Sequence, residues 1–493
     1  MFQPHSLFDL AKESLVKNES AVTGPLLPIP CTVWEDLFTE AMQSNSQVIV
    51  AAMVAACPLS WLDLDSMMEQ ASSSLSMLSS VFKGLGIMLD QRPPCATGQL
   101  TVLLPPAPET WVHEELDPEH RCYFENRPAE MQSPRKPRRE RRSRSAPRQP
   151  VGELELVGDL SFKMMQSNEL LTFLRCRVQE GKVLPLLCCQ KVTFSDDLPE
   201  FPVIEKILGS VRLDRVEELR IHHTEDRRLL SMLAPYLPRL VHLRTLLLQS
   251  LVVKQGSSRQ RRLLARWNTD EELDGIFTEL TSQLTHLRQL QHLRLSNVYL
   301  CGNVGQFLRH LETPLESLTI SSIPCSLEIS DLQALSSYPC TSKLKVLNLS
   351  HNNLANINVG LLRTVIYKIS ATLDLLDLSH CGLLNSHLVA ILSALSQCEQ
   401  LRLFRFCGNC VDVSTMKRLL RRTIPTDKSR LMVLPLPDDA EDDDDDVYDY
   451  EIESRFINGL SLLLQELGVH SQIYVIRDEE FLEEHIKVLM LRT

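Results

Sequence analysis

The sequence lacks the segments that direct a chain to a membrane or anchor it there. Met1 is followed by neither the basic stretch nor the apolar core of a secretory signal. The longest apolar run, Val48 to Cys57, is too short to span a bilayer, and we expect it to form a buried helix. Without a secretory signal, the 14 cysteines are expected to stay reduced in the cytoplasm or nucleus.

Motifs that carry catalysis are also missing. The chain contains no phosphate-binding glycine loop, no H-E-x-x-H zinc helix and no G-x-S-x-G nucleophile turn. One C-x-x-C pair, Cys407 and Cys410, has no second pair at metal-ligand spacing. The net charge of −12 argues against a dedicated nucleic-acid binder. We therefore expect no enzyme, no cofactor, no metal and no membrane partner.

What the sequence does contain is a strong internal repeat. Leu344 to Leu354 (LKVLNLSHNNL) matches every fixed position of the pattern L-x-x-L-x-L-x-x-N-x-L, and Leu373 to Leu383 matches it with Cys381 at the asparagine position. The steps between successive copies are 33, 27, 47, 25, 29, 29 and 28 residues, and five of these seven fall in the range of leucine-rich repeats. The other copies begin at Val183 (a degenerate one), Val216, Leu243, Leu290, Leu315 and Leu401.

The repeat predicts an α/β fold, a leucine-rich-repeat solenoid shaped like a horseshoe. The fourth and sixth leucines of each copy point inward from a short strand, and the Asn or Cys caps the following turn. A helix such as Val359 to Ser370 then covers the convex side. One copy cannot bury its apolar face alone, but stacked copies can. We expect an N-terminal helical cap and a C-terminal α/β cap, made of a helix over Arg455 to Gly468 and a following strand.

Composition divides the chain into five parts. We predict an N-terminal helical region (1–90), a linker (91–150), degenerate first repeats (151–215), the leucine-rich repeats (216–425) and a C-terminal cap (426–493). The 47-residue step contains an insertion, Val253 to Leu280, with a basic loop and a helix from about Thr269. This insertion is either a lengthened convex element or a dedicated binding loop.

Two charged low-complexity segments flank the repeats. The Arg- and Pro-rich stretch from Ser133 to Pro150 has no apolar period and predicts a disordered linker, a nuclear-import signal or an RNA contact. The acidic stretch 437–451 predicts a solvated loop, which could instead fold back on the basic linker. The candidate import residues are Arg135, Lys136, Arg138, Arg139, Arg141 and Arg142.

The concave face is the candidate partner-binding surface. The central residue of each predicted strand points outward, and strands about 4.8 Å apart give a ladder about 30 Å long. Its chemistry is mixed, which suits a protein surface better than a phosphate backbone. The predicted ladder comprises Arg220, Leu247, Arg294, Thr319, Asn348, Asp377 and Arg405.

Two short N-terminal patterns resemble docking boxes. SLFDLAKESL has the form [S/T]-L-x-x-x-[C/A]-x-x-x-L and resembles a BC box, the helix by which substrate receptors bind elongin C. IPCTVWEDL resembles a cullin-2 box. Alternatively, both helices only cap the N-terminal end of the solenoid. The matching residues are Ser6, Leu7, Ala11 and Leu15 for elongin, and Ile29, Pro30, Val33 and Leu37 for the cullin.

Beyond these patterns, the whole chain resembles the PRAME family of leucine-rich-repeat proteins. The similar stretches keep family order from residue 5 to about 475. They are SLFDLAKESLVKNE, IPCTVWEDLFTEAM, CPLSWLDLDSMM, VLPLLCCQKV, PLESLTI, SATLDLLDL, LSQCEQLRLFRFCGN and LLLQELG.

The resemblance implies a substrate-recognition adaptor of a cullin-2 RING ubiquitin ligase. Elongin B and C, cullin-2 and a RING subunit would be its partners, and an unknown target protein would occupy the concave face for proteasomal degradation. The resemblance also implies roles in negative regulation of transcription and apoptosis, in differentiation and in proliferation, in cytoplasm and nucleus. The alternatives are a nuclear scaffold or corepressor without a ligase role, and a cytosolic inhibitor that sequesters a kinase.

Overall fold

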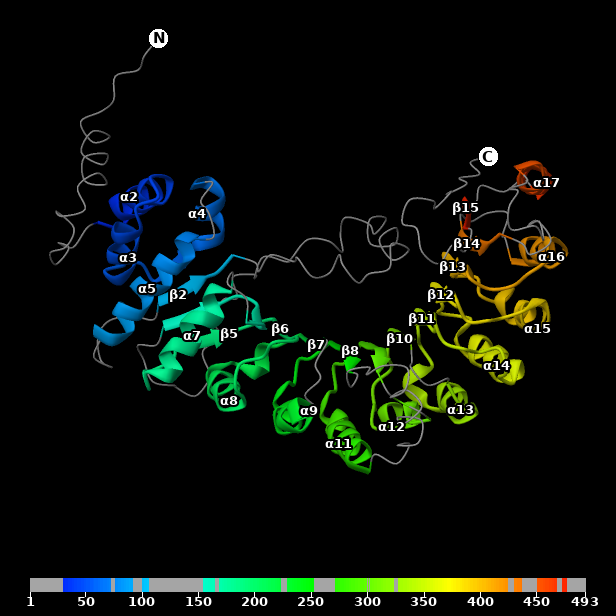
Figure 1. Ribbon diagram of the computed structural model, residues 1–493, viewed down its shortest axis with the longest axis horizontal. Coiled ribbons are helices and arrows are strands. Elements are labelled where there is room, and N and C mark those ends of the chain that lie inside the picture. Colours follow the sequence, from blue (N-terminus) through cyan, green and yellow to red (C-terminus); the bar gives the residue numbers. More distant parts are fainter. Residues whose placement is uncertain are drawn as a thin grey trace, which may run out of the picture. The chain divides into compact units, whose positions relative to one another are not determined.

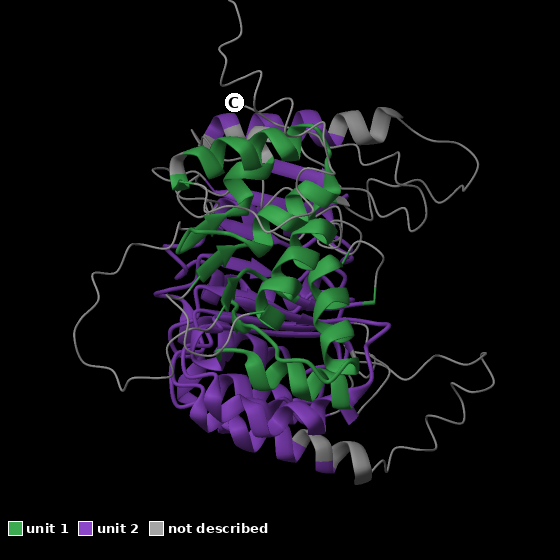
Figure 2. Cartoon of the chain, turned by 90° about the vertical axis from the view of Figure 1, so that its left-hand side faces the viewer, with its two compact units in different colours: residues 1–160, 164–189, 202–212 green, residues 161–163, 190–201, 213–493 purple. Residues whose placement is uncertain are grey.

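The computed structural model separates the chain into two compact units (Figure 2). Unit 1 comprises residues 1–160, 164–189 and 202–212, and unit 2 comprises 161–163, 190–201 and 213–493. The structure describes residues 30–71, 76–91, 100–105, 154–164, 168–222, 228–251, 271–298, 300, 302–322, 327–423, 430–436, 450–467 and 472–476. The predicted elongin-binding residues (Ser6, Leu7, Ala11, Leu15), Ile29 of the cullin-box pattern, the basic linker residues and positions 437–449 of the acidic segment lie outside these ranges.

Unit 1 contains a four-stranded sheet of order β1-β2-β3-β5 in its described part, with parallel pairing throughout. Strand β2 lies in the range expected to be a linker. It forms a strand because the buried Leu100 and Val102 alternate with half-exposed neighbours and bury one face of it. The strands are β1 (Trp61–Asp63), β2 (Leu100–Leu103), β3 (Leu154–Val157) and β5 (Leu186–Cys188). The helices are α2 (Cys31–Gln43), α3 (Gln47–Ala55), α4 (Leu64–Ala71), α5 (Ser76–Gln91), α7 (Glu169–Gln179) and, for most of its length, α8 (Phe201–Ser210).

Helix α3 forms the centre of the helical part of unit 1. It covers most of the apolar run predicted to be a buried helix, and that prediction is confirmed because five of its nine residues are buried. Trp34 of α2 stacks on Phe38 with ring centroids 4.8 Å apart. Its indole Nε1 donates to the carbonyl of Met53 on α3 at 3.3 Å, so the neighbouring helices are joined by a polar bond as well as by packing.

Unit 2 contains an eleven-stranded sheet in its described part, of order β15-β14-β13-β12-β11-β10-β9-β8-β7-β6-β4, and all pairings from β6 to β15 are parallel. Within this unit the strands line the inner side of a curve and the helices the outer side (Figure 1). The strands are β4 (Leu160–Phe162), β6 (Lys191–Phe194), β7 (Glu218–His222), β8 (Thr245–Leu251), β9 (His292–Val298), β10 (Ser317–Ser321), β11 (Val346–Asn348), β12 (Leu375–Asp377), β13 (Leu403–Arg405), β14 (Leu431–Pro435) and β15 (Gln472–Ile476). The α-helices are α9 (Arg228–Leu233), α11 (Glu271–Ser282), α12 (Val304–Arg309), α13 (Ile329–Ser337), α14 (Val359–Ile369), α15 (Asn385–Leu395), α16 (Val413–Thr423) and α17 (Tyr450–Leu467).

The repeat pattern predicts this arrangement closely, and the solenoid fold is confirmed. Helix α14 begins at the predicted residue and ends one residue early, and α11 begins inside the predicted insertion and ends two residues beyond it. Helix α17 begins five residues before the predicted start, and β15 is the predicted terminal strand. The degenerate copy at Val183 spans β5 and the start of β6. Short 3-10 turns over Leu213–Arg215, Ala234–Arg239, Gln283–His286 and Pro339–Thr341 complete the connections.

Side chains at the asparagine position bind successive repeats together. The buried Asn409 donates Nδ2 to the carbonyls of Leu378 and Phe406, at 2.8 and 2.9 Å, and its Oδ1 accepts from the amides of Cys381 and Leu383. At the same position of the preceding repeat, Cys381 donates Sγ to the carbonyl of Leu349 at 3.2 Å. The predicted equivalence of Asn and Cys therefore holds, because both side chains donate to a carbonyl of the neighbouring turn.

Candidate functional site

The seven residues predicted to line the concave face lie in one register of the unit 2 sheet. Parallel pairing joins Arg220 to Leu247 and Leu247 to Arg294, and the same register continues strand by strand to Arg405. It also extends one strand before and two strands after the predicted ladder. This line is the central row: Thr193, Arg220, Leu247, Arg294, Thr319, Asn348, Asp377, Arg405, Val433 and Tyr474.

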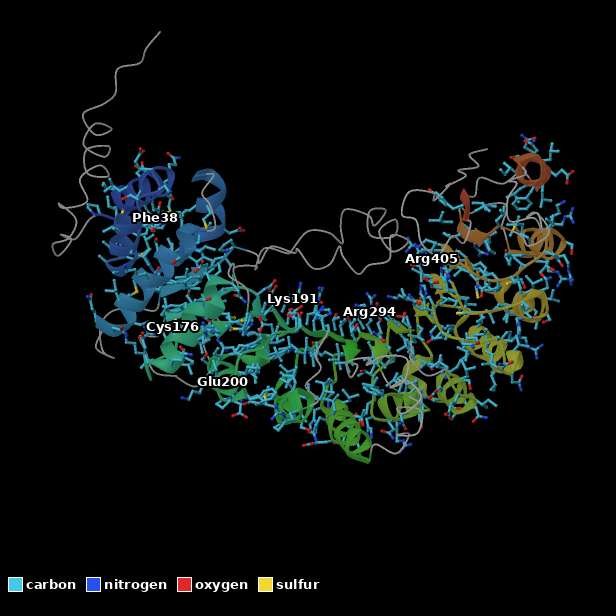
Figure 3. The ribbon with its side chains drawn as sticks, viewed as in Figure 1. Phe38, Cys176, Lys191, Glu200, Arg294 and Arg405 are labelled. Carbon is cyan, nitrogen blue, oxygen red and sulfur yellow. The ribbon has the colours of Figure 1, made fainter. Side chains whose placement is uncertain are left out.

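Exposure differs along the central row. Arg220, Arg294 and Thr319 are half-buried, whereas their counterparts on β11, β12 and β13 are only 6%, 2% and 4% exposed. Side chains on neighbouring parallel strands stand about 4.8 Å apart, so long neighbours cover short ones. Figure 3 labels Arg294 and Arg405 on the strand side of unit 2, and Glu200 on the opposite side. Of the seven predicted residues, a partner can therefore reach Arg220, Arg294 and Thr319 most easily, whereas Leu247 on β8 is 9% exposed.

The buried half of the central row is held by polar contacts within the sheet. Asn348 Oδ1 accepts from the amide and the hydroxyl of Ser350, at 2.8 and 2.7 Å. Asp377 Oδ1 accepts from the Ser379 amide at 3.0 Å, and its Oδ2 lies 3.7 Å from Nη1 of Arg405. Nε of Arg405 is buried and has no hydrogen-bond partner among the described residues. These contacts position the side chains, and they leave less capacity for a ligand than the other half of the row has.

The row that precedes the central row by two residues changes character along the sheet. Its members on β6 to β10 are polar, and those on β11 to β14 are apolar. In strand order they are Lys191, Glu218, Thr245, His292, Ser317, Val346, Leu375, Leu403 and Leu431. A partner would therefore meet hydrogen-bonding groups along β6 to β10, whereas the apolar Leu375 and Leu403 are only 6% and 5% exposed.

Charges on the two rows are predominantly positive although the whole chain carries −12. Lys191, Arg220, Arg294 and Arg405 are the cations of these rows, against two carboxylates. Glu218 accepts from Nε of Arg220, and Asp377 faces Arg405. The rim before the strands carries its own matched ion pairs: Glu217 with Arg244, Glu316 with Lys345 and Asp374 with Arg402.

Arg294 differs from the other guanidinium groups of the face. Its Nε donates to the hydroxyl of Ser296 at 3.3 Å, and no carboxylate of the described residues lies within 4.0 Å of it. Ser296 Oγ lies 2.9 Å from Ser321 Oγ on the next strand. Burial lowers the pKa of Arg294, and the nearby charge of Arg220 lowers it further. The guanidinium is thus partly removed from water without a counter-ion.

A row of left-handed backbone residues lies at or just after the carboxyl ends of the strands, and sequence reasoning missed it. Ser250, Asn297, Ser322, His351 and His380 have φ between 51° and 55°, and Gly408 occupies the same position after β13 with φ of 64°. The rings of His351 and His380 stack with centroids 4.5 Å apart. A Cβ on Gly408 would lie 2.2 Å from Nδ1 of His380, so glycine is required there. The available signal was the recurrence of Asn, Ser and His before the asparagine position.

Most of the described cysteines are buried, whereas Cys31, Cys176 and Cys410 are exposed. Burial raises the pKa of Cys381 to about 12 and the pKa values of Cys340 and Cys398 to about 11, so their thiols stay protonated at neutral pH. Of the C-x-x-C pair, Cys407 is buried and Cys410 exposed. In the described part of the chain, no three His, Cys, Asp or Glu side chains cluster in a way that could hold a metal ion. No helix there is long and apolar enough to cross a bilayer.

The described residues of the cullin-box pattern lie at the start of α2. Pro30 precedes the helix and is exposed, Val33 is half-buried, and Leu37 is 7% exposed within unit 1. The carbonyl of Pro30 accepts from the amides of Val33 and Trp34, at 3.0 and 2.9 Å. The pattern therefore combines one surface residue with one that packs into the core.

Solved structures similar to this chain are distant in sequence. The leucine-rich-repeat-containing protein LegL7 from Legionella pneumophila is 13% identical, with a TM-score of 0.37 over 65% of this chain and 91% of that one. A TLR13–ssRNA13 complex is 14% identical, with a TM-score of 0.29 over 68% of this chain and 38% of that one.

Sequence relatives are much closer. Human PRAME family member 20 is 32% identical over 442 residues, which cover 89% of this chain and 87% of that protein. Human PRAME family member 12 is 30% identical over 88% of this chain and 85% of that protein. The mouse preferentially expressed antigen in melanoma-like protein 1 is 30% identical over 88% of this chain and 89% of that protein. Family models for the PRAME N-terminal and C-terminal domains match residues 4–104 and 154–477, and the chain therefore belongs to the PRAME family.

Proposed function

We propose that this protein is the substrate-recognition subunit of a cullin-2 RING ubiquitin ligase. The observation that carries the recognition half of the proposal is the central row, which offers a continuous line of side chains on one face of a rigid sheet. Stacked repeats hold such a face in place, and extended concave surfaces of this kind bind protein partners. Membership of the PRAME family supports the ligase half.

The ligase partners would be recruited through the N-terminal region. Elongin C would bind the N-terminal segment that contains Ser6, Leu7, Ala11 and Leu15, with Leu7 as the apolar anchor and the small Ala11 allowing close approach. Cullin-2 would contact the exposed start of α2 at Pro30, and cullin-2 would bring the RING subunit. The protein itself would be no enzyme, because ubiquitin transfer is carried out by the machinery that it recruits.

The target protein would be captured in the nucleus and the cytoplasm and then degraded by the proteasome. The basic stretch from Arg135 to Arg142 would provide nuclear import. Removal of the target would account for negative regulation of transcription and apoptosis and for effects on differentiation and proliferation.

The burial of Leu37 favours a second candidate function, a nuclear scaffold or corepressor without a ligase role. In that case α2 serves only to build unit 1, because Leu37, Trp34 and Phe38 all face its core. The concave face would still hold a partner, and the partner would not be degraded.

Affinity purification from cells, followed by mass spectrometry, separates the two functions. The wild type would be compared with Leu7→Ser and with Pro30→Ala, and the exposed Glu35→Ala on α2 would be the control. Pro30→Ala keeps the backbone carbonyl that begins the helix, so protein abundance should not change. The ligase role is supported if elongins and cullin-2 are recovered with wild type and control, if both are reduced with Leu7→Ser, and if cullin-2 is reduced with Pro30→Ala. Absence of elongins from every sample contradicts it.

A further inference from the structure

We infer that Arg294 forms an anion-binding subsite at the centre of the concave face, and that it pairs with a carboxylate of an acidic segment of the bound target protein. The inference rests on the proposed function insofar as the concave face holds the target. It goes further by naming the chemistry of the group that the target presents and the residue that reads it.

The first argument is the missing counter-ion. Arg294 is half-buried, and a partly buried cation loses hydration energy that a neighbouring anion normally restores. The only hydrogen bond that its side chain makes within the described part of the protein is Nε to Ser296 Oγ, at 3.3 Å. Both terminal Nη groups therefore remain available, and they are the two donors that a carboxylate engages in a bidentate pair.

The second argument is the composition of the surroundings. The strands β8, β9 and β10 present no Asp or Glu among the described residues on the central row or on the rows two residues either side of it. Those positions hold hydroxyl, amide, imidazole and apolar groups instead: Thr245, Leu247, Gln249, His292, Ser296, Ser317, Thr319 and Ser321. An incoming carboxylate thus meets donors and no competing anion.

The third argument is the contrast with the other arginines of the face. Arg220 has Glu218 as an acceptor, and Arg405 has Asp377 on the neighbouring strand β12. Arg220 lies two strands, or about 10 Å, from Arg294. Its charge therefore adds to the positive potential at Arg294 while its own carboxylate partner is already in place. Because the subsite is positively charged, the complementary partner segment is acidic.

Binding of a fluorescein-labelled hexaglutamate peptide to the full chain tests the inference. Fluorescence anisotropy at low ionic strength would compare wild type with Arg294→Gln and Arg294→Lys. The matched control is Arg309→Gln, which removes the same charge from an exposed arginine at the end of α12. A second peptide, with one phosphoserine in a sequence that is otherwise neutral, distinguishes phosphate from carboxylate as the anion.

Arg294→Gln is expected to weaken hexaglutamate binding about tenfold or more, because a charge-assisted bidentate pair is lost. Arg294→Lys is expected to give a smaller loss, since lysine keeps the charge but not the planar pair of donors. Arg309→Gln should bind within about twofold of wild type. Arg294→Gln should also unfold at the same or a higher urea concentration than wild type, because no structural ion pair is removed.

Four results would overturn the inference. They are failure of the wild type to bind hexaglutamate, equal losses in Arg294→Gln and Arg309→Gln, binding of the phosphoserine peptide alone, and marked destabilisation by Arg294→Gln. Failure here leaves the ligase role intact if elongins are still recovered with Arg294→Gln. Conversely, hexaglutamate binding that depends on Arg294 without elongin recovery would support the subsite on a scaffold that is not a ligase.

Discussion

Two glycines of one helix should respond oppositely to the same substitution. Gly84 and Gly86 both lie in α5, two residues apart. A Cβ added at Gly84 would lie 2.4 Å from the carbonyl oxygen of Ala51 and 2.7 Å from Cβ of Val54, both on α3. A Cβ added at Gly86 would make an ordinary contact, 3.5 Å from the ring of Phe173.

The magnitudes follow from two opposing terms. Replacing a helical glycine by alanine stabilises the helix by about 1 kcal/mol at either position. At position 84 the backbone of α3 cannot yield as a flexible side chain would, so the helices must separate by about half an ångström or more, and overpacking of this kind costs about 1–3 kcal/mol. Gly84→Ala is therefore expected to lower the free energy of unfolding by up to about 2 kcal/mol, and Gly86→Ala to raise it by up to about 1 kcal/mol.

Urea unfolding followed by tryptophan fluorescence checks this prediction, since Trp34 is buried and bonded to α3. The difference between the two variants isolates the contact with α3, because the gain in helix propensity is common to both. If Gly84→Ala proves as stable as Gly86→Ala, the close approach of α3 and α5 is not the reason for the glycine.

Three further predictions concern polar groups of unit 2. Asn409→Ala leaves the amides of Cys381 and Leu383 without their acceptor, so it should lower the free energy of unfolding in urea by about 2–4 kcal/mol. As a control, substitution of the exposed Asn356 by alanine should change this free energy by less than about 0.5 kcal/mol. Asp331 is 1% exposed and accepts from the amides of Val304 and Glu328, so Asp331→Asn places an NH₂ group against one donor. This substitution should lower the free energy of unfolding in urea by about 1–3 kcal/mol, and a value equal to that of the wild type would contradict the reasoning. The carboxyl of Asp412 accepts from the amide of Thr415 at the start of α16, and this hydrogen bond lowers the pKa of the carboxyl. The stabilisation by Asp412 is therefore present above the pKa of the unfolded chain, about 3.9, and is lost as the pH falls through the lower pKa of the native protein. The destabilisation caused by Asp412→Ala, about 1 kcal/mol at pH 6, should therefore shrink below about pH 4, and a constant difference down to pH 2 would refute that cause.

The spacing of leucines carries much of the fold. A strand needs its inward residues at the fourth and sixth positions of each copy, and parallel strands in register then align their fifth positions. For this reason the central row from Arg220 to Arg405 could be read from the sequence before any packing was known. The same rule failed to identify β14, because Leu431–Pro435 is an apolar run that no asparagine position follows.

The sequence was less informative about unit 1. Its strands are three or four residues long and are separated by long intervals, so no fixed period links them. Strand β2 could not be distinguished from a linker by composition, since its pairing with β1 and β3 depends on residues far away in the chain. The requirement for Gly84 is likewise a property of where α3 and α5 cross.

The sequence by itself determined the repeat, the row of residues on the concave face and the kinship to the PRAME family, because each depends on residue identity at fixed spacing. Only the tertiary structure decided which members of that row remain accessible and which charges are matched. Arg220, Arg294 and Arg405 look alike as sequence positions, yet Glu218 pairs with the first, Asp377 faces the last, and Arg294 has no carboxylate of the described chain beside it. Pairing and desolvation depend on what neighbouring strands bring within a few ångströms, and spacing along one chain does not specify that.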